Sequence, residues 1–127
     1  MKILIVDDSL SARYFLKNCI PEKTDYQVIE AVDGKEGLEQ FQALRPDITF
    51  LDITMPVMDG FAALEEMIKI DPHALIAVLS SDIQKKTMRR ILSLGAFLFL
   101  QKPPTAKIIT DAIDKAQKIR ESGQSND

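Results

Sequence analysis

Acidic side chains stand at the ends of two short apolar segments of this chain. Residues 3–6 are followed at once by Asp7 and Asp8, and residues 48–51 are followed by Asp52. Buried parallel strands are near-continuous apolar runs, and α/β sheets bind ligands just beyond the carboxyl ends of their strands. If these two strands are neighbours, three carboxylates meet and repel one another unless a positive group lies among them. The spacing therefore predicts a site for a cation or for a phosphoryl group.

Two further polar side chains follow later apolar segments. Ser80 comes after residues 75–79, and Lys102 comes after residues 96–100. A hydroxyl can donate a hydrogen bond to a phosphoryl oxygen, and a lysine ammonium supplies a point charge to the same group. Carboxylates can hold Mg²⁺, and a carboxylate can attack phosphorus to form an acyl phosphate. Together these residue types suit phosphoryl transfer to an aspartate, where positioning and charge neutralisation supply most of the catalysis.

The segments that must position these residues alternate between strand and helix patterns. Predicted strands occupy residues 2–7, 26–31, 47–52, 75–79 and 96–100. Predicted helices occupy residues 10–20, 35–44, 61–70, 83–94 and 106 to about 120. Ser9, Asp82 and Thr105 are the predicted N-caps of the first, fourth and last helices. The alternation predicts an α/β fold in which helices cover both faces of a parallel sheet.

The composition is that of a single globular domain. The chain has 127 residues, of which 46% are hydrophobic and 28% are charged, and its net charge is -3. An acidic domain offers no electrostatic footprint for nucleic acid. One cysteine, Cys19, excludes an internal disulfide and fits a reducing compartment. The apolar run at residues 3–6 is too short for a signal peptide, and no stretch approaches a membrane span. We therefore expect a cytoplasmic protein with no direct nucleic-acid or membrane partner.

The combination of these motifs resembles the receiver domains of two-component response regulators, among them the stand-alone chemotaxis regulators. The resemblance covers residues 1 to about 117, and the order and spacing of its short motifs make it specific. The motifs are Val6-Asp7-Asp8-Ser9, residues 51–60, Leu79-Ser80-Ser81, Gly95-Ala96 and Lys102-Pro103. It implies a doubly wound, flavodoxin-like (βα)5 three-layer sandwich with strand order 2-1-3-4-5. The prediction that the strands before Asp8 and Asp52 are neighbours thus comes from the resemblance and not from the periodicity.

The resemblance also implies a role for each matching polar residue. Asp52 matches the phosphoacceptor aspartate, and Lys102 matches the lysine that pairs with the phosphoryl group. Asp8 and Asp52 match direct ligands of Mg²⁺, and Asp7 matches an acid that acts on the metal through water. Thr54 is expected to offer its backbone carbonyl to the metal. Mg²⁺ is the one cofactor expected.

Ser80 and Phe99 match the pair of residues through which such domains switch state. The Ser80 hydroxyl is expected to move inward to the phosphoryl group and to vacate space that Phe99 can fill. The surface formed by the fourth helix, the fifth strand and the last helix then changes shape. Phosphorylation biases a pre-existing equilibrium in this scheme. The chain is therefore expected to be a phosphoacceptor signalling domain that assists its own phosphorylation and dephosphorylation, and not an enzyme.

The expected partners follow from the same resemblance. A histidine kinase is the expected phosphodonor, for which small acyl phosphates can substitute. An output protein is expected at the switching surface, and a phosphatase is a further expected partner. Four cations of the fourth helix form either a solvated face or a docking surface for an acidic partner: Lys85, Lys86, Arg89 and Arg90. Residues 1–120 should form the receiver domain, and residues 121–127 a flexible polar tail or the start of a linker in a longer protein.

Three other functions remain to be weighed against this hypothesis. A haloacid-dehalogenase-type phosphatase also uses an aspartate nucleophile with Mg²⁺, but its general acid is missing because Ser9 stands two residues after Asp7. A flavin carrier would need a phosphate-binding loop after the first strand, where the two acids repel phosphate. An interaction domain that works without phosphorylation would not need so complete a set of polar residues.

Overall fold

The computed structural model describes residues 1–55 and 58–125, and within them strands and helices alternate throughout. The strands are β1 (Lys2–Val6), β2 (Gln27–Ala31), β3 (Ile48–Asp52), β4 (Ile76–Ser80) and β5 (Leu98–Gln101). The helices are α1 (Leu10–Cys19), α2 (Gly34–Leu44), α3 (Gly60–Ile70), α4 (Lys85–Ser93) and α5 (Ala106–Ser125). Pro56 and Val57 of the loop motif, and the last two residues of the predicted tail, lie outside the described residues.

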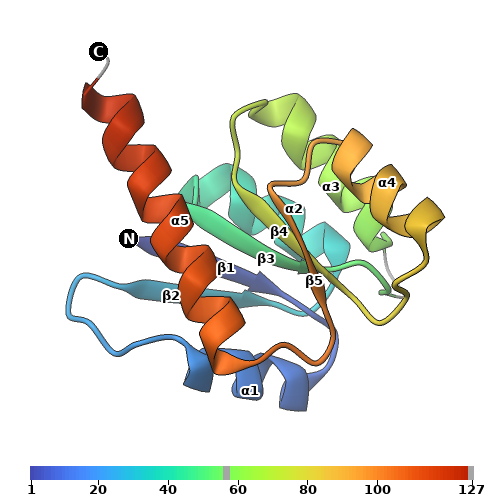
Figure 1. Cartoon of the computed structure of the whole chain (residues 1–127), viewed down its shortest axis with the longest axis horizontal. Coiled ribbons are helices and arrows are strands. Elements are labelled where there is room, and N and C mark those ends of the chain that lie inside the picture. The colour runs from blue at the N-terminus through green and yellow to red at the C-terminus, as the bar shows by residue number, and fades with distance from the viewer. Residues whose placement is uncertain (56–57, 126–127) are drawn as a thin grey trace.

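The strands form one parallel sheet in the order β2-β1-β3-β4-β5 (Figure 1). The register pairs Val6 of β1 with Leu51 of β3, and Asp52 of β3 with Leu79 of β4. The predicted α/β fold and the strand order implied by the resemblance are both confirmed. Because β1 and β3 are neighbours in register, Asp7, which follows β1, and Asp52, the last residue of β3, lie at the same edge of the sheet.

Both faces of the sheet are buried, which explains why its strands are almost continuously apolar. Successive residues of β1 point to opposite faces, so Ile3 and Ile5 pack with α1 and α5, whereas Leu4 and Val6 pack with α2, α3 and α4. Figure 1 shows α1 and α5 on one face and the other three helices on the opposite face. The central strands are thereby held rigidly from both sides, and the loops at their carboxyl ends are the parts left to form a site.

The predicted caps of α1 and α5 are confirmed, but that of α4 is wrong. Ser9 accepts a hydrogen bond from the N–H of Ala12, and Thr105 accepts one from the N–H of Ile108, each at 3.2 Å. The fourth helix begins at Lys85, two residues later than predicted. Asp82 instead accepts the N–H of Gln84 at 3.0 Å, and such a local side-chain bond keeps the backbone in a turn.

Helix α5 is longer than its polar end suggested. It continues to Ser125, so residues 121–125 of the predicted tail belong to it. Arg120 is paired with Asp47 at 2.9 Å, which fastens the helix to the start of β3. The final turns of α5 project past the sheet in Figure 1. Among the described residues, no helix is long and apolar enough to cross a membrane.

Candidate functional site

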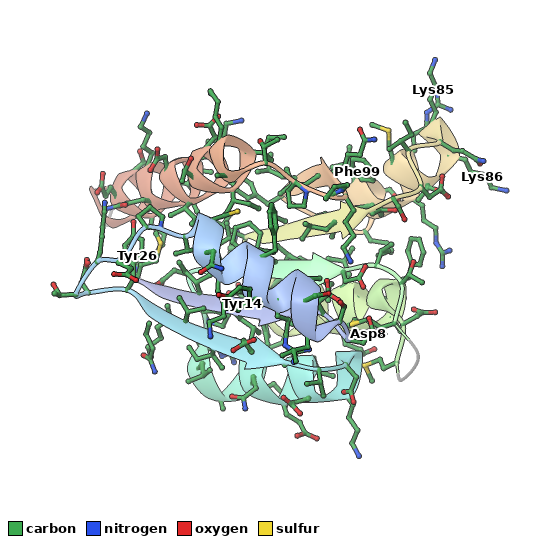
Figure 2. The ribbon with its side chains drawn as sticks, turned by 90° about the horizontal axis from the view of Figure 1, so that it is seen from below. Asp8, Tyr14, Tyr26, Lys85, Lys86 and Phe99 are labelled. Carbon is green, nitrogen blue, oxygen red and sulfur yellow. The ribbon has the colours of Figure 1, made fainter. Side chains whose placement is uncertain are left out.

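The three acids at the carboxyl ends of β1 and β3 lie together. One carboxylate oxygen from each of Asp7, Asp8 and Asp52 lies within 4.8 Å of the other two. Asp7 and Asp52 are each only 5% exposed, whereas Asp8 is exposed at the rim beside the start of α1 (Figure 2). The predicted meeting of the three acids is therefore confirmed.

Lys102 reaches the same cluster from the loop after β5. Its Nζ lies 2.9 Å from Oδ2 of Asp7 and 3.4 Å from Oδ2 of Asp52. Its backbone N–H donates to the carbonyl of Ser80, which continues the pairing of β4 with β5. Burial lowers the pKa of Lys102, but the hydrogen bonds and charges of the two acids outweigh it and leave the pKa raised. The ammonium therefore remains charged beside the carboxylates.

One lysine does not balance the negative charge around Asp52. Burial raises the pKa of the Asp52 carboxyl, and the neighbouring charge of Asp7 raises it further. Lys102 and the N–H of Thr54, which donates to Asp52 at 3.3 Å, lower the pKa only in part. The carboxylate is thus short of positive charge, which is the condition that favours binding of a cation.

Asp7 is held at every one of its polar groups. Its N–H donates to the carbonyl of Ala31 at 3.1 Å, and its Oδ1 accepts the N–H of Ser9 at 2.9 Å. Its carbonyl accepts Nη1 of Arg13 at 2.8 Å. Arg13 was not among the predicted site residues. The available signal is its spacing with Leu16, which places a cation on the buried face of α1, where a charged group needs an internal partner.

Ser80 ends β4 close to the cluster, but its hydroxyl is occupied locally. The residue is buried, and its Oγ donates to the carbonyl of Asp82 at 3.1 Å while accepting the N–H of Asp82 at 3.0 Å. The carboxylate of Asp82 in turn accepts the hydroxyl of Thr87 at 2.7 Å. A movement of Ser80 would therefore disturb the turn that leads into α4.

Phe99 lies on the face of the sheet that α4 covers. It is half-buried and packs against the cluster that contains Ile91 of α4. Phe99 is in register with Val78, whose side chain shares a face with that of Ser80 because strand residues alternate. The structure thus places the two predicted switch residues on the same face of neighbouring strands, and their coupled movement stays a prediction.

Two clefts open near the acidic cluster, one bordered by Asp7 and the other by Thr54 and Ser80. The cleft beside α1 measures about 360 Å³, is mainly apolar, and is bordered by Asp7 and Lys102 together with Phe15 and Pro104. The cleft beside α4 measures about 320 Å³, and Thr54, Ser80 and Asp82 are among the residues that line it. The cleft beside α1 is thus mainly apolar, whereas the cleft beside α4 has a mixed polar and apolar lining.

The donor set suits a hard cation. Three carboxylates supply oxygen ligands, and the exposed Asp8 leaves the site open to water, which Mg²⁺ retains when it binds to proteins. The N–H of Thr54 already contacts Asp52. The role of the Thr54 backbone carbonyl as a metal ligand stays a prediction.

Comparison with known proteins gives the family. Residues 3–114 match the family model of the response regulator receiver domain. The chain is 40% identical over 118 residues to the chemotaxis protein CheY of Thermotoga maritima, covering 92% of this chain and 98% of that protein. Its fold matches that of Vibrio cholerae chemotaxis protein CheY4 with a TM-score of 0.82 at 27% identity, covering 91% and 97% of the two chains.

A third similar protein is known as part of a complex. The CheX-CheY-BeF3-Mg+2 complex of Borrelia burgdorferi matches with a TM-score of 0.81 at 29% identity, covering 89% of this chain and 86% of that chain. This chain therefore belongs to the receiver-domain family of two-component response regulators, which are signalling domains. Within that family it is similar over nearly its whole length to CheY proteins. Membership of this family overturns the alternative that the chain is a haloacid-dehalogenase-type phosphatase.

Proposed function

We propose that this receiver domain accepts a phosphoryl group on Asp52 and signals through the resulting change of shape. The observation that carries the proposal is the position of Asp52. It is a buried carboxylate at a strand end, lies in a cluster with Asp7 and Asp8, and has the ammonium of Lys102 at 3.4 Å. A buried acid in such surroundings is destabilised as an anion, which favours reaction with an electrophile or association with a cation.

The proposed reaction is an in-line transfer to the carboxylate. One oxygen of Asp52 forms a bond to phosphorus while the bond from phosphorus to the donor breaks, and the electron pair leaves with the donor. A histidine kinase is the proposed donor in the cytoplasm, its phosphohistidine nitrogen being the leaving atom, and a small acyl phosphate can replace it. Lys102 would pair with a phosphoryl oxygen, and Ser80 would donate a hydrogen bond to another.

Mg²⁺ is the proposed cofactor of this transfer. Asp8 and Asp52 would bind it directly, Asp7 through water, and Thr54 through its backbone carbonyl. When bound, Mg²⁺ supplies positive charge that offsets the repulsion between the acids and an incoming phosphoryl group. The similar Borrelia burgdorferi complex includes Mg²⁺, which supports this assignment.

The proposed output surface consists of α4, β5 and α5. Ser80 would exchange its bonds to Asp82 for one to the phosphoryl group, which loosens the turn before α4 and makes room for Phe99. Figure 2 shows Lys85 and Lys86 projecting outward from the start of α4, which fits an acidic output partner. Arg90 has a different role, because its guanidinium lies 3.8 Å from the centroid of the Phe61 ring.

The output surface is tested by reversing the charges of Lys85 and Lys86 while Arg90 is left unchanged. In a pull-down from cell extract with acetyl phosphate and Mg²⁺, we expect Lys85→Glu with Lys86→Glu to lose the acidic partner that the wild type retains. Lys35→Glu with Lys69→Glu, at exposed positions of α2 and α3 outside the proposed surface, is the matched control for the same change of net charge. Unchanged capture by the double variant would contradict the proposed partner chemistry.

The phosphoacceptor is tested by intact mass after incubation with acetyl phosphate and Mg²⁺. We expect one phosphoryl adduct on the wild type, its loss in Asp52→Asn, and its retention in Asp111→Asn, which removes an exposed acid of α5. EDTA present during the incubation should prevent formation of the adduct if Mg²⁺ is the cofactor. An adduct that persists in Asp52→Asn, or no adduct on the wild type, would defeat the proposal. A phosphatase partner would shorten the lifetime of the same adduct.

A further inference from the structure

We propose that Arg13 is a positioning residue for the cation site, because its guanidinium fixes the backbone between Asp7 and Asp8 and thereby directs their carboxylates. The inference rests on the proposed function, since it concerns the same acids. It is distinct from the roles of the acids themselves, because Arg13 acts through the main chain.

The first observation is where the sheet stops. β1 ends at Val6, whose partners are Ala31 on one side and Leu51 on the other. The N–H of Asp7 still reaches the carbonyl of Ala31, but the carbonyl of Asp7 is bound by Nη1 of Arg13 at 2.8 Å. A buried carbonyl needs a donor, and here a side chain provides it where the sheet no longer does.

The second observation is that the guanidinium is itself held in place. Arg13 Nε donates to Glu30 Oε1 at 3.1 Å, and the arginine side chain is only 10% exposed. Glu30 lies on β2 opposite Ile5, and its other oxygen accepts Lys17 at 3.1 Å. Burial raises the pKa of Glu30, but the hydrogen bonds and charges of Lys17 and Arg13 outweigh it and lower the pKa, so the glutamate remains an anion.

The third step concerns the direction of the carboxylates. Asp7 points one oxygen at the N–H of Ser9 and the other at Lys102, and Asp8 follows on the same peptide that Arg13 holds. Rotation of that peptide would turn both acids at once. Groups that orient metal ligands from outside commonly change metal affinity by about 10–100-fold when they are removed. Loss of the Arg13 bond should therefore weaken the cation site without removing any ligand.

The test is the dissociation constant for Mg²⁺ alone, measured by calorimetry on the full chain. We expect Arg13→Met to bind Mg²⁺ about tenfold or more weakly than the wild type. The Mg²⁺ affinity of Arg13→Lys should fall between those of the wild type and Arg13→Met. An ammonium can donate to the carbonyl of Asp7, but it lacks the planar guanidinium with which arginine donates to Glu30 at the same time. Lys17→Met is the matched control, since Lys17 contacts Glu30 but not Asp7, and its affinity should stay within about twofold of the wild type.

A second measurement keeps the test decisive if Arg13→Met folds poorly. In Arg13→Lys without metal, we expect faster hydrogen exchange of the Ser9 amide, which bonds to Asp7, and no change of the Ala62 amide, which bonds to Asp59 at the start of α3. Mg²⁺ affinities within about twofold of the wild type in both Arg13 variants would overturn the inference, as would an equal loss in Lys17→Met. If the wild type binds no Mg²⁺, the inference and the proposed cofactor both fail. If the wild type binds it and the Arg13 variants match it, only the inference fails.

Discussion

At the scale of single residues, the surroundings of Asp52 oppose the ionisation of its carboxyl group. Burial and the charge of Asp7 raise its pKa, so the folded protein binds a proton on Asp52 more tightly than the unfolded chain does. At neutral pH the charged carboxylate therefore destabilises the folded state. The penalty is present above the raised pKa and disappears as the pH falls below the value for an unfolded aspartate, about 3.9.

Asp52→Asn should consequently stabilise the protein at pH 7 in EDTA, because it removes the buried charge while Lys102 keeps its bond to Asp7. The advantage over the wild type should shrink as the pH is lowered through the range between the raised pKa and the unfolded value. Urea unfolding at a series of pH values measures it. Asp8→Asn, which removes an exposed acid of the same cluster, should give a smaller gain. A lower midpoint for Asp52→Asn than for the wild type at pH 7 would contradict the argument.

The acids, the serine and the lysine could be predicted from the sequence for a common reason. Each follows an apolar run, and the carboxyl ends of parallel strands share one edge of the sheet. The contribution of Arg13 could not be predicted in the same way. Its acceptor is the backbone carbonyl of Asp7, and a carbonyl has no signature in the sequence.

At the scale of helices and strands, the position of Asp52 depends on how α3 begins. Gly60 is the first residue of α3, and its N–H donates to the carbonyl of Ile53 at 2.9 Å. A Cβ on Gly60 would lie 2.5 Å from the carbonyl oxygen of Asp52 and closer still to the backbone of Ile53. Backbone atoms cannot move aside as the end of a side chain can, so a substitution must displace the residue that carries the proposed chemistry.

Gly60→Ala is therefore expected to destabilise the domain by about 1–3 kcal/mol, the usual range for overpacking, and to slow the formation of the phosphoryl adduct. Denaturant unfolding and the rate of mass increase with acetyl phosphate measure the two effects. Gly123→Ala is the matched control, because nothing lies within 4 Å of a Cβ at that position of α5. Alanine there should stabilise the helix by up to about 1 kcal/mol. Equal behaviour of the two variants would show that the start of α3 does not constrain Asp52.

Helix α4 depends on a side-chain bond that the sequence does not specify. The sequence predicts Asp82 as the cap of a helix from residue 83, but its carboxylate bonds to Gln84 and to the hydroxyl of Thr87 inside the first turn of α4. Both arrangements use the tendency of aspartate to bind nearby N–H groups, and the sequence cannot tell which N–H it chooses. The same Asp82 binds Ser80 through its backbone.

Thr87→Val should loosen the start of α4 because it removes the hydroxyl that Asp82 accepts while keeping the shape of the side chain. We expect the amides of the first turn of α4 to exchange with solvent about fivefold faster. This factor corresponds to the net free energy that one ordinary hydrogen bond contributes to stability. Thr110→Val is the control, since the Thr110 hydroxyl bonds within α5, to the carbonyls of Ala106 and Lys107. Exchange that is unchanged in Thr87→Val would show that the bond does not hold the turn.

At the scale of the whole molecule, the site exists because of long-range pairing. Apolar runs and their alternation with helices predict which segments are strands, but they do not predict which strands are neighbours. The order β2-β1-β3-β4-β5 brings Asp8, Asp52 and Lys102 together from three segments that lie far apart along the chain. Any ligand that binds these groups must therefore bind the folded protein in preference to the unfolded chain.

Mg²⁺ should accordingly stabilise the global fold. A ligand that binds only the native state adds about 2.7 kcal/mol at a concentration about 100 times its dissociation constant. We expect a higher midpoint of urea unfolding in Mg²⁺ than in EDTA, and reversal of the gain when EDTA is added. Asp8→Asn should lose most of this gain, because it removes an exposed ligand, while Asp111→Asn should keep it. Equal midpoints of the wild type with and without Mg²⁺ would mean that the three clustered acids do not form a cation site. Lys102 would then be the group that relieves their mutual repulsion.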